Sequence, residues 1–212
     1  MKHPWIVAVG HQFCSGGAET AKRVAELLGV PFYNRQLIDE AAGILNMDAE
    51  HVAKHDEKPT GFWEYSALGH AGYGHISGLQ PMLPHSMRVA HAQFDAIRKI
   101  AKEGSCVIIG HCADQVLKDE PFVLPVFVRA RVEHRVERAM QLYELSEPKA
   151  KKLIRRNDKI RAGYYNSHTQ SEWGHPRQYA MMLDTGILGI ESTAQLIVCA
   201  VEERDKYALA EE

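Results

Sequence analysis

The fold of this chain follows from residues 5–20, which read WIVAVGHQFCSGGAET. The first five of these residues are apolar, and they predict a short buried strand that ends at Gly10. Apolar residues then recur on one stripe from Ala18 to Leu28, which predicts a helix that ends at Gly29. Glycines in the connecting turn let backbone N–H groups approach an anion at the positive end of that helix. The turn therefore suits a phosphate-binding loop, although no Gly-Lys-Ser/Thr follows, and a plain strand-to-helix turn is the alternative.

The rest of the chain alternates between strand and helix patterns. Short apolar runs predict four more strands, at residues 30–33, 106–110, 122–128 and 179–184. Helical patterns predict helices at residues 35–43, 87–101 and 132–143, one that begins after Ser146, and one at 190–201. Strands that alternate with helices form βαβ units, so we expect an α/β fold with a parallel sheet. The charged residues from 202 onward are expected to fray.

Length and composition fit a single globular domain with an insertion. The chain has 212 residues, 45% of them hydrophobic and 25% charged, and we place the domain at residues 1–205 and a tail at 206–212. A net charge of −2 disfavours nucleic acid and membrane surfaces as partners. The four cysteines are scattered without a CxxC pair, and no apolar run approaches the roughly 20 residues of a transmembrane helix. These features predict a cytoplasmic protein.

Residues 56–86 break the alternation of strands and helices. Glycines, prolines and aromatic residues are mixed there without strand or helix spacing, which predicts an irregular insertion. A loop of this length in a compact domain is usually functional or mobile. It is a candidate acceptor region, and a contact in a homodimer is the alternative.

A strongly basic segment lies at residues 149–161. It holds seven lysines and arginines and one acid, Asp158, for a local charge of +6. Arginine side chains match phosphate oxygens with two parallel hydrogen bonds, so the segment is a candidate phosphate contact. A solvated helix face and a nucleic-acid contact are the alternatives, the second disfavoured by the low net charge.

A third candidate segment, GHCAD at residues 110–114, follows the predicted strand at 106–110. Open α/β sheets bind ligands beyond the carboxyl ends of their strands. Asp114 is therefore placed to hold Mg²⁺ through water or to orient a substrate, and a simple helix start is the alternative. The twelve histidines show no zinc-binding spacing, so no metal site made of protein ligands is expected.

Taken together, these segments resemble the cytidylate kinase-like family, a branch of the P-loop nucleoside monophosphate kinases. The resemblance covers nearly the whole chain and is carried by the order and spacing of residues 13–26, 30–38, 107–114, 157–165 and 184–191. It implies a P-loop NTPase-type three-layer fold with a five-stranded parallel sheet. It also implies a helical lid at residues 145–172 and an acceptor region at the 56–86 insertion.

The resemblance further implies transfer of the γ-phosphoryl group of ATP, with Mg²⁺, to CMP, dCMP or a similar small acceptor. The partner is then a nucleotide or another small phosphate-bearing ligand. ATP would meet Cys14, Ser15, Gly16, Gly17, Ala18 and Thr20, with the Thr20 hydroxyl near Mg²⁺. The acceptor would meet Asn34, Arg35, His111 and Asp114. The catalytic lid residues would be Arg155, Arg156 and Arg161, with Asp158 orienting one of them.

Departures from the family pattern lie where cations are expected near phosphates. The loop lacks the Walker lysine of established cytidylate kinases. Ala18, His11 and His111 stand where this branch often has arginine. Protonated His11 and His111 would replace that charge at low pH. The sequence therefore predicts an active phosphotransferase, with a non-catalytic nucleotide- or phosphate-binding protein on the same scaffold as the alternative.

Overall fold

The computed structural model describes residues 3–34, 43 and 85–208. The helix predicted at 35–43, apart from Gly43, and residues 56–84 of the predicted insertion lie outside the described residues. The strands are β1 (Ile6–His11), β2 (Phe32–Tyr33), β3 (Cys106–Ile109), β4 (Val123–Arg129) and β5 (Met181–Asp184). The helices are α1 (Gly17–Leu28), α5 (His85–Glu103), α6 (Ala113–Val116), α7 (Val132–Tyr143), α8 (Glu147–His168), the short 3-10 helix η2 (Pro176–Gln178) and α9 (Thr185–Ala208).

The five strands form one sheet in the order β2-β3-β1-β4-β5, and every pair is parallel. This confirms the predicted five-stranded parallel sheet. Strand β1 lies at the centre, where Val9 pairs with Ile109 of β3 and with Val126 of β4. Because all strands run in one direction, their carboxyl ends share one edge, and the loop after β1 begins in the middle of that edge.

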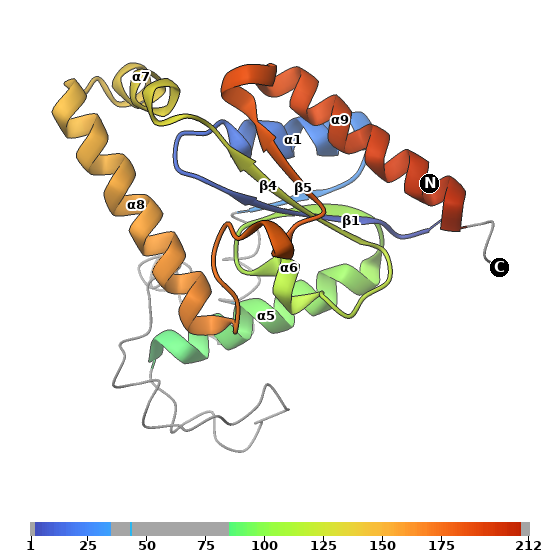
Figure 1. Cartoon of the computed structure of the whole chain (residues 1–212). Helices are drawn as coiled ribbons and strands as arrows, with labels where there is room; N and C mark the ends of the chain where they lie inside the picture. Colours follow the sequence, from blue (N-terminus) through green and yellow to red (C-terminus); the bar gives the residue numbers. More distant parts are fainter. Residues whose placement is uncertain (1–2, 35–42, 44–84, 209–212) are drawn as a thin grey trace.

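Helices cover both faces of the sheet, which confirms the three-layer fold (Figure 1). Strand β1 shows why, because successive side chains of a strand point to opposite faces. Val7 and Val9 pack with residues of α1 and α9, whereas Ile6 and Ala8 pack with residues of α5 and α6. All four side chains are buried, so the apolar run predicted as a buried strand forms the centre of both halves of the core.

The carboxyl-terminal segment differs from its prediction. Residues 202–208 were expected to fray, but α9 continues through them to Ala208. The reason is Asp205, a buried acid that accepts hydrogen bonds from Trp5 Nε1 at 2.9 Å and from His3 N at 3.1 Å. This carboxylate ties the last turns of α9 to the residues before β1.

Helix α9 is also, among the described residues, the one helix with the length and apolar composition of a membrane span. Ala194, Ile197 and Val201 are fully buried in the core between α9, α1 and the sheet. The apolar character of α9 is therefore explained in part by its packing in this fold.

Asp205→Ala should lower the free energy of unfolding by about 1–3 kcal/mol, because it leaves the buried indole N–H of Trp5 without its acceptor. Urea denaturation of the whole chain measures the change. Glu202→Ala, an exposed acid on the same helix, is the matched control and should lie within about 0.5 kcal/mol of the unsubstituted chain. Equal stability of both variants would show that the contact does not hold α9 in place.

Candidate functional site

The turn between β1 and α1 has the backbone of an anion-binding loop. Cys14 (φ 59°) and Gly16 (φ 79°) both adopt left-handed conformations, and α1 begins at Gly17. The N–H groups of the first helical turn have no acceptor within the helix, and they lie at its positive end. The left-handed conformation of a non-glycine residue such as Cys14 costs about 1–2 kcal/mol, which is typical of functional turns.

Side chains of the loop anchor it to the neighbouring elements. The Ser15 hydroxyl is buried and donates to the carbonyl of Val128 on β4 at 3.1 Å, and Thr185 at the start of α9 donates to the carbonyl of Ser15. The Thr20 hydroxyl is fully buried and donates to the carbonyl of Gly16 at 2.9 Å. Ser15 therefore offers a ligand its backbone, and the Thr20 hydroxyl is directed into its own helix rather than toward the mouth of the loop.

Gly17 lies so close to β1 that no other residue fits. A Cβ atom at this position would be 2.3 Å from the Cβ atom of His11. Burial, followed by the nearby Arg161, lowers the pKa of His11 well below its usual value of 6.5. This shift keeps His11 neutral to lower pH than a free imidazole, so it does not favour the expectation that protonated His11 replaces an arginine at low pH. His111 is also buried.

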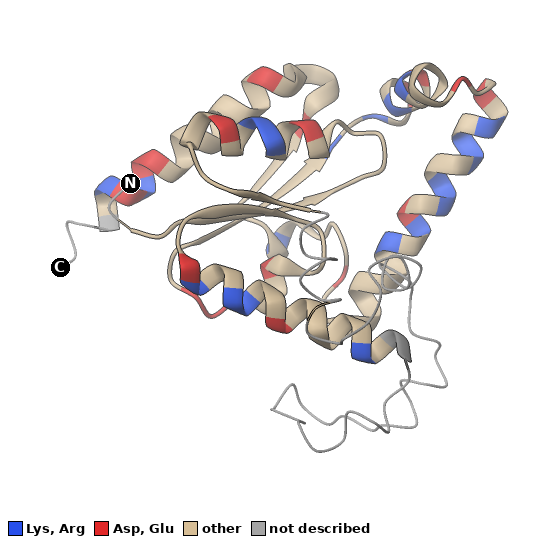
Figure 2. Cartoon of the chain, turned by 180° about the vertical axis from the view of Figure 1, so that it is seen from behind, with Lys and Arg blue, Asp and Glu red and all other residues tan. Residues whose placement is uncertain are grey.

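The predicted lid residues on helix α8 have two different environments, since some contact the loop and others are exposed to solvent. Arg161 faces the loop, where its Nη1 donates to the carbonyl of His11 at 3.0 Å and its guanidinium lies 5.5 Å from the centroid of the Phe13 ring. Asp158 also faces the loop and accepts a hydrogen bond from Phe13 N at 2.8 Å. Arg155 and Arg156 are exposed among the other cations that follow the length of α8 (Figure 2). Across the described part of the chain, these two arginines make no hydrogen bond or ion pair with the loop.

Two arginines of α7 lie near the loop and were not predicted from the sequence. Both Nη atoms of Arg135 donate to Asp158 Oδ2 at 2.7 Å, and Arg138 pairs with Glu19 in the first turn of α1. Both arginines act electrostatically on the Cys14 thiol, whose pKa is nevertheless raised because burial is the larger effect. A sequence signal existed, because Arg135 is three residues from Val132 and four from Ala139 and therefore shares the apolar face of its helix.

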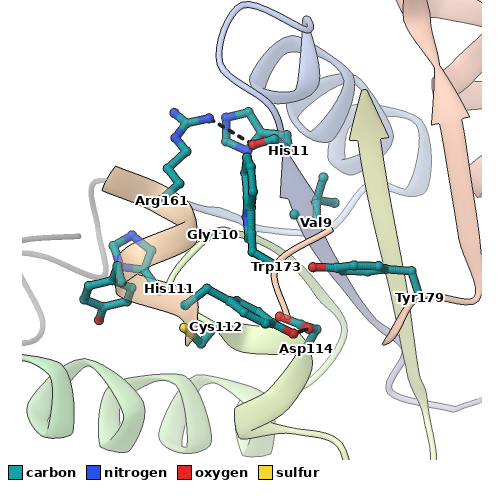
Figure 3. A pocket seen from close by; sticks show the side chains of 12 residues that line it. Val9, His11, Gly110, His111, Cys112, Asp114, Arg161, Trp173 and Tyr179 are labelled. Carbon is teal, nitrogen blue, oxygen red and sulfur yellow. Dashed lines mark hydrogen bonds between the residues drawn. The ribbon is translucent and has the colours of Figure 1, made fainter. Parts of the chain in front are cut away.

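A pocket lies beside the loop at the carboxyl ends of β1 and β3 (Figure 3). It encloses about 430 Å³, including its opening to solvent. Its lining comes from the end of β1 (Val9, Gly10, His11), the turn after β3 and α6 (Gly110, His111, Cys112, Asp114), α8 (Arg161, Tyr164, Tyr165) and the following segment (Trp173, Tyr179). The structure thus brings the predicted residues His111, Asp114 and Arg161 together.

Other predicted acceptor residues are not part of this lining. Asn34 is exposed at the end of β2 and does not line the pocket, and Arg35 lies outside the described residues. The aromatic residues Tyr165, Trp173 and Tyr179 line the pocket but were not predicted as site residues. They come from the end of α8 and from the loop after it, and nothing in their spacing indicates that they meet at β3.

Asp114 is the polar centre of the pocket. It is 8% exposed and accepts a hydrogen bond from the Tyr165 hydroxyl at 2.5 Å. Burial raises the pKa of Asp114, although the hydrogen bonds from Tyr165 and Gln115 act against that rise. Burial and the neighbouring Asp114 carboxyl raise the pKa of Tyr165, so the phenol stays a neutral donor. The pocket therefore combines one hydrogen-bonded carboxyl, one guanidinium and several aromatic rings, which suits a small polar ligand.

Comparison with known proteins agrees with this geometry. The model of the cytidylate kinase-like family matches residues 6–187. The solved structure of an uncharacterized protein from Eubacterium ventriosum ATCC 27560 is 25% identical, with a TM-score of 0.70 over 93% of this chain and 98% of that one. No curated protein matches the chain.

Two solved kinases share the fold at lower identity. A gluconokinase from Sinorhizobium meliloti 1021 is 14% identical, with a TM-score of 0.53 over 98% of this chain and 99% of that one. A shikimate kinase from Bacteroides thetaiotaomicron is 14% identical, with a TM-score of 0.52 over 93% of this chain and 98% of that one. At this identity the likeness shows the P-loop kinase fold and nothing finer.

Gly17→Ala should lower the free energy of unfolding by about 1–3 kcal/mol, the usual cost of forcing extra volume into a packed site. The added methyl group would collide with the backbone-proximal part of His11, which cannot rotate away. Thermal and urea unfolding measure the loss. Gly43→Ala is the matched control, because a Cβ there meets none of the described residues within 4 Å. A Gly17→Ala chain as stable as the control variant would contradict the close approach.

Stability should fall as the pH is lowered from 7 to 5, in part because of His11. In the unfolded chain His11 gains a proton near pH 6.5, whereas its pKa in the folded chain is lower, so acid favours unfolding. The stability that neutral His11 contributes is fully present above pH 6.5 and is lost as the pH falls toward the pKa of His11 in the folded chain. The free energy of unfolding falls by at most about 1.4 kcal/mol per pH unit from this one group.

His11→Gln should flatten this pH dependence, measured as the free energy of unfolding at half-unit intervals. Burial also lowers the pKa values of His91 and His168, and both histidines remain in the variant. The pH dependence that the variant keeps is therefore due to these two histidines and to other titratable groups. His134→Gln, at an exposed position on α7, controls for the substitution itself. Parallel profiles for His11→Gln and the unsubstituted chain would contradict the assignment.

Proposed function

The chain belongs to the cytidylate kinase-like family, and from this premise we propose that it transfers the γ-phosphoryl group of ATP to a small acceptor, with CMP and dCMP as the first candidates. The observation that carries the proposal is the position of Arg161. Its guanidinium contacts the end of β1 at the glycine loop, and the same side chain lines the neighbouring pocket. One cation thus joins a loop suited to phosphates and a pocket suited to the acceptor.

The donor side of the site fits a triphosphate through the main chain. Gly17 has no Cβ atom, the turn at Gly16 is left-handed, and the first-turn N–H groups of α1 are available to phosphate oxygens. Mg²⁺ usually takes most of its ligands from phosphates and water, so it does not require a cage of carboxylates. The described residues contain no group of three or more potential metal ligands. Bound Mg²⁺ would supply neutralisation of the phosphate charge.

Arginines on α7 and α8 are proposed to supply the charge that the loop lacks. Arg161 is already at the loop, and Arg138 lies at the first turn of α1. Arg155 and Arg156 are exposed on α8, so their proposed catalytic role requires movement of this helix, which we propose as the lid at residues 145–172. Preorganised cations of this kind stabilise the charge that develops on a transferring phosphoryl group.

The acceptor is proposed to bind in the pocket. The carboxyl of Asp114, held by the hydroxyl of Tyr165, would orient it through hydrogen bonds, and the surrounding aromatic rings would exclude water. Asn34 and Arg35 are proposed to meet an acceptor phosphate as it enters from the side of β2. We also propose that the protein is cytoplasmic and that its partners are small molecules rather than nucleic acid or membrane.

A non-catalytic nucleotide-binding role is the second candidate. It is favoured by Ala18 and by the neutral His11 at positions where cations are expected. Binding through main-chain amides alone does not require those cations, whereas stabilising a transition state does.

An ADP-release assay with CMP, dCMP, UMP, AMP and GMP at pH 6 and pH 8 tests the proposal. We expect turnover with CMP or dCMP, and Arg161→Ala should reduce kcat/KM by about 10²–10³-fold, as loss of one electrostatic contact to a transition state does. Arg98→Ala is the control, because Arg98 lies on α5 and pairs with Asp95 at the surface.

The two candidate functions separate in the same set of experiments. Absence of turnover with all five acceptors at both pH values would reject the phosphotransferase. Calorimetric titration with ATP and CMP then decides the rest, since binding without turnover supports the second candidate and absence of binding removes both.

A further inference from the structure

Asp158 places a negative charge beside a loop suited to phosphates, and its contacts show what this carboxylate does there. One carboxylate oxygen, Oδ1, accepts the hydrogen bond from Phe13 N at 2.8 Å. The other, Oδ2, accepts hydrogen bonds from both Nη atoms of Arg135 at 2.7 Å. A single side chain of α8 therefore joins the loop after β1 to helix α7.

Arg135 neutralises the negative charge of Asp158 at this position. Its side chain is 6% exposed, and a guanidinium buried to this extent needs a carboxylate partner. The pair is neutral as a whole, so the repulsion between Asp158 and a bound phosphate chain is largely cancelled. What remains at the loop is the hydrogen bond to Phe13 N.

The ring of Phe13 is held by the same two helices. It stacks on Tyr143 of α7, with ring centroids 5.9 Å apart and planes inclined by 15°, and Arg161 lies over it. Phe13 and Cys14 also pack against the apolar core that Val136 and Ala139 of α7 form with Ala150 and Ile154 of α8. Residue 13 is thus fixed by its backbone and by its side chain.

This fixation acts directly before the strained part of the loop. Cys14 is left-handed although it carries a side chain, and such a conformation persists only where the surroundings determine it. Asp158 holds the N–H group of the preceding residue, so it limits the backbone rotation by which Cys14 would relax. The turn at Gly16 and the first amides of α1 follow within the next few residues.

We propose that Asp158 is a positioning residue through which α8 keeps the loop in its phosphate-binding shape. The proposal rests on the proposed function only in taking the loop as the donor site. It replaces the expectation that Asp158 orients a cation of the lid, because its cationic partner, Arg135, belongs to α7. It also makes the 158–161 turn of α8 a support of the loop, so that lid movement would have to occur elsewhere along the helix.

Two double variants isolate the hydrogen bond from the ion pair. Arg135→Met removes the buried cation, and replacing both members of a buried pair by neutral groups is often tolerated. In that background, Asp158→Asn keeps an oxygen that can accept from Phe13 N, whereas Asp158→Ala has none. A role limited to joining α7 and α8 would make the two double variants alike. Should the alanine variant fail to fold, Asp158→Leu in the same background also lacks an acceptor and fills the space.

The first measurement is residue-resolved amide hydrogen exchange of the whole chain without ligand. We expect the Phe13 amide to exchange about tenfold faster in R135M/D158A than in R135M/D158N, the factor that one hydrogen bond provides. The second is the Kd for ATP, which should be about tenfold weaker in R135M/D158A, with the KM for ATP rising more than kcat falls. Glu147→Gln, which removes an acid of α8 that pairs with Lys151 away from the loop, should change neither.

Equal exchange and equal ATP affinity in the two double variants would overturn the proposal. If the unsubstituted chain binds no ATP, the proposed function fails, and the exchange comparison still decides whether Asp158 orders the loop.

Discussion

Helix α1 can start directly against the end of β1 only because residue 17 has no side chain. The 2.3 Å between an added Cβ and the Cβ of His11 leaves no room for any other residue. This close approach sets the N-terminus of α1 at the carboxyl edge of the sheet, where β1 lies between β3 and β4. The pocket at the ends of β1 and β3 lies beside the same edge, so the position of every candidate ligand depends on this contact.

In the proposed function, the positive charge for bound phosphates comes from helices α7 and α8 rather than from the loop itself. A lysine in the loop would need only local structure, whereas arginines on α7 and α8 require these helices to be packed against it. The small core of Val136, Ala139, Ala150 and Ile154, with Phe13 and Cys14 against it, provides that packing. Charge and loop shape are therefore coupled, since a change that loosens α7 from α8 also loosens the loop.

The sequence predicted the parts of the molecule that local patterns determine. Short apolar runs located all five strands, although β2 and β5 begin two residues later than predicted. The glycine turn before Ala18 located the loop. The roles of Arg135 and Asp205 were missed because each depends on a partner far along the chain, at residues 158 and 5. From one sequence alone, charged residues on a helix or near a chain end are predicted to be exposed to solvent. Only the tertiary fold shows that Arg135 and Asp205 are buried. The meeting of Tyr165 and Asp114 was unpredictable for the same reason.

Backbone strain gathers around the candidate site. Of the four non-glycine residues with positive φ in the described part of the chain, Cys14, His111 and Cys112 lie in the loop or the pocket. Each such residue costs about 1–2 kcal/mol, an appreciable part of the roughly 5–15 kcal/mol that keeps a typical domain folded. The hydrogen bonds from Ser15 to β4, from Thr185 to Ser15 and from Phe13 N to Asp158 offset that cost on the loop side. A shape maintained in this way exists before any ligand arrives, so binding of a phosphate ligand, as proposed above, would require little further ordering of the loop.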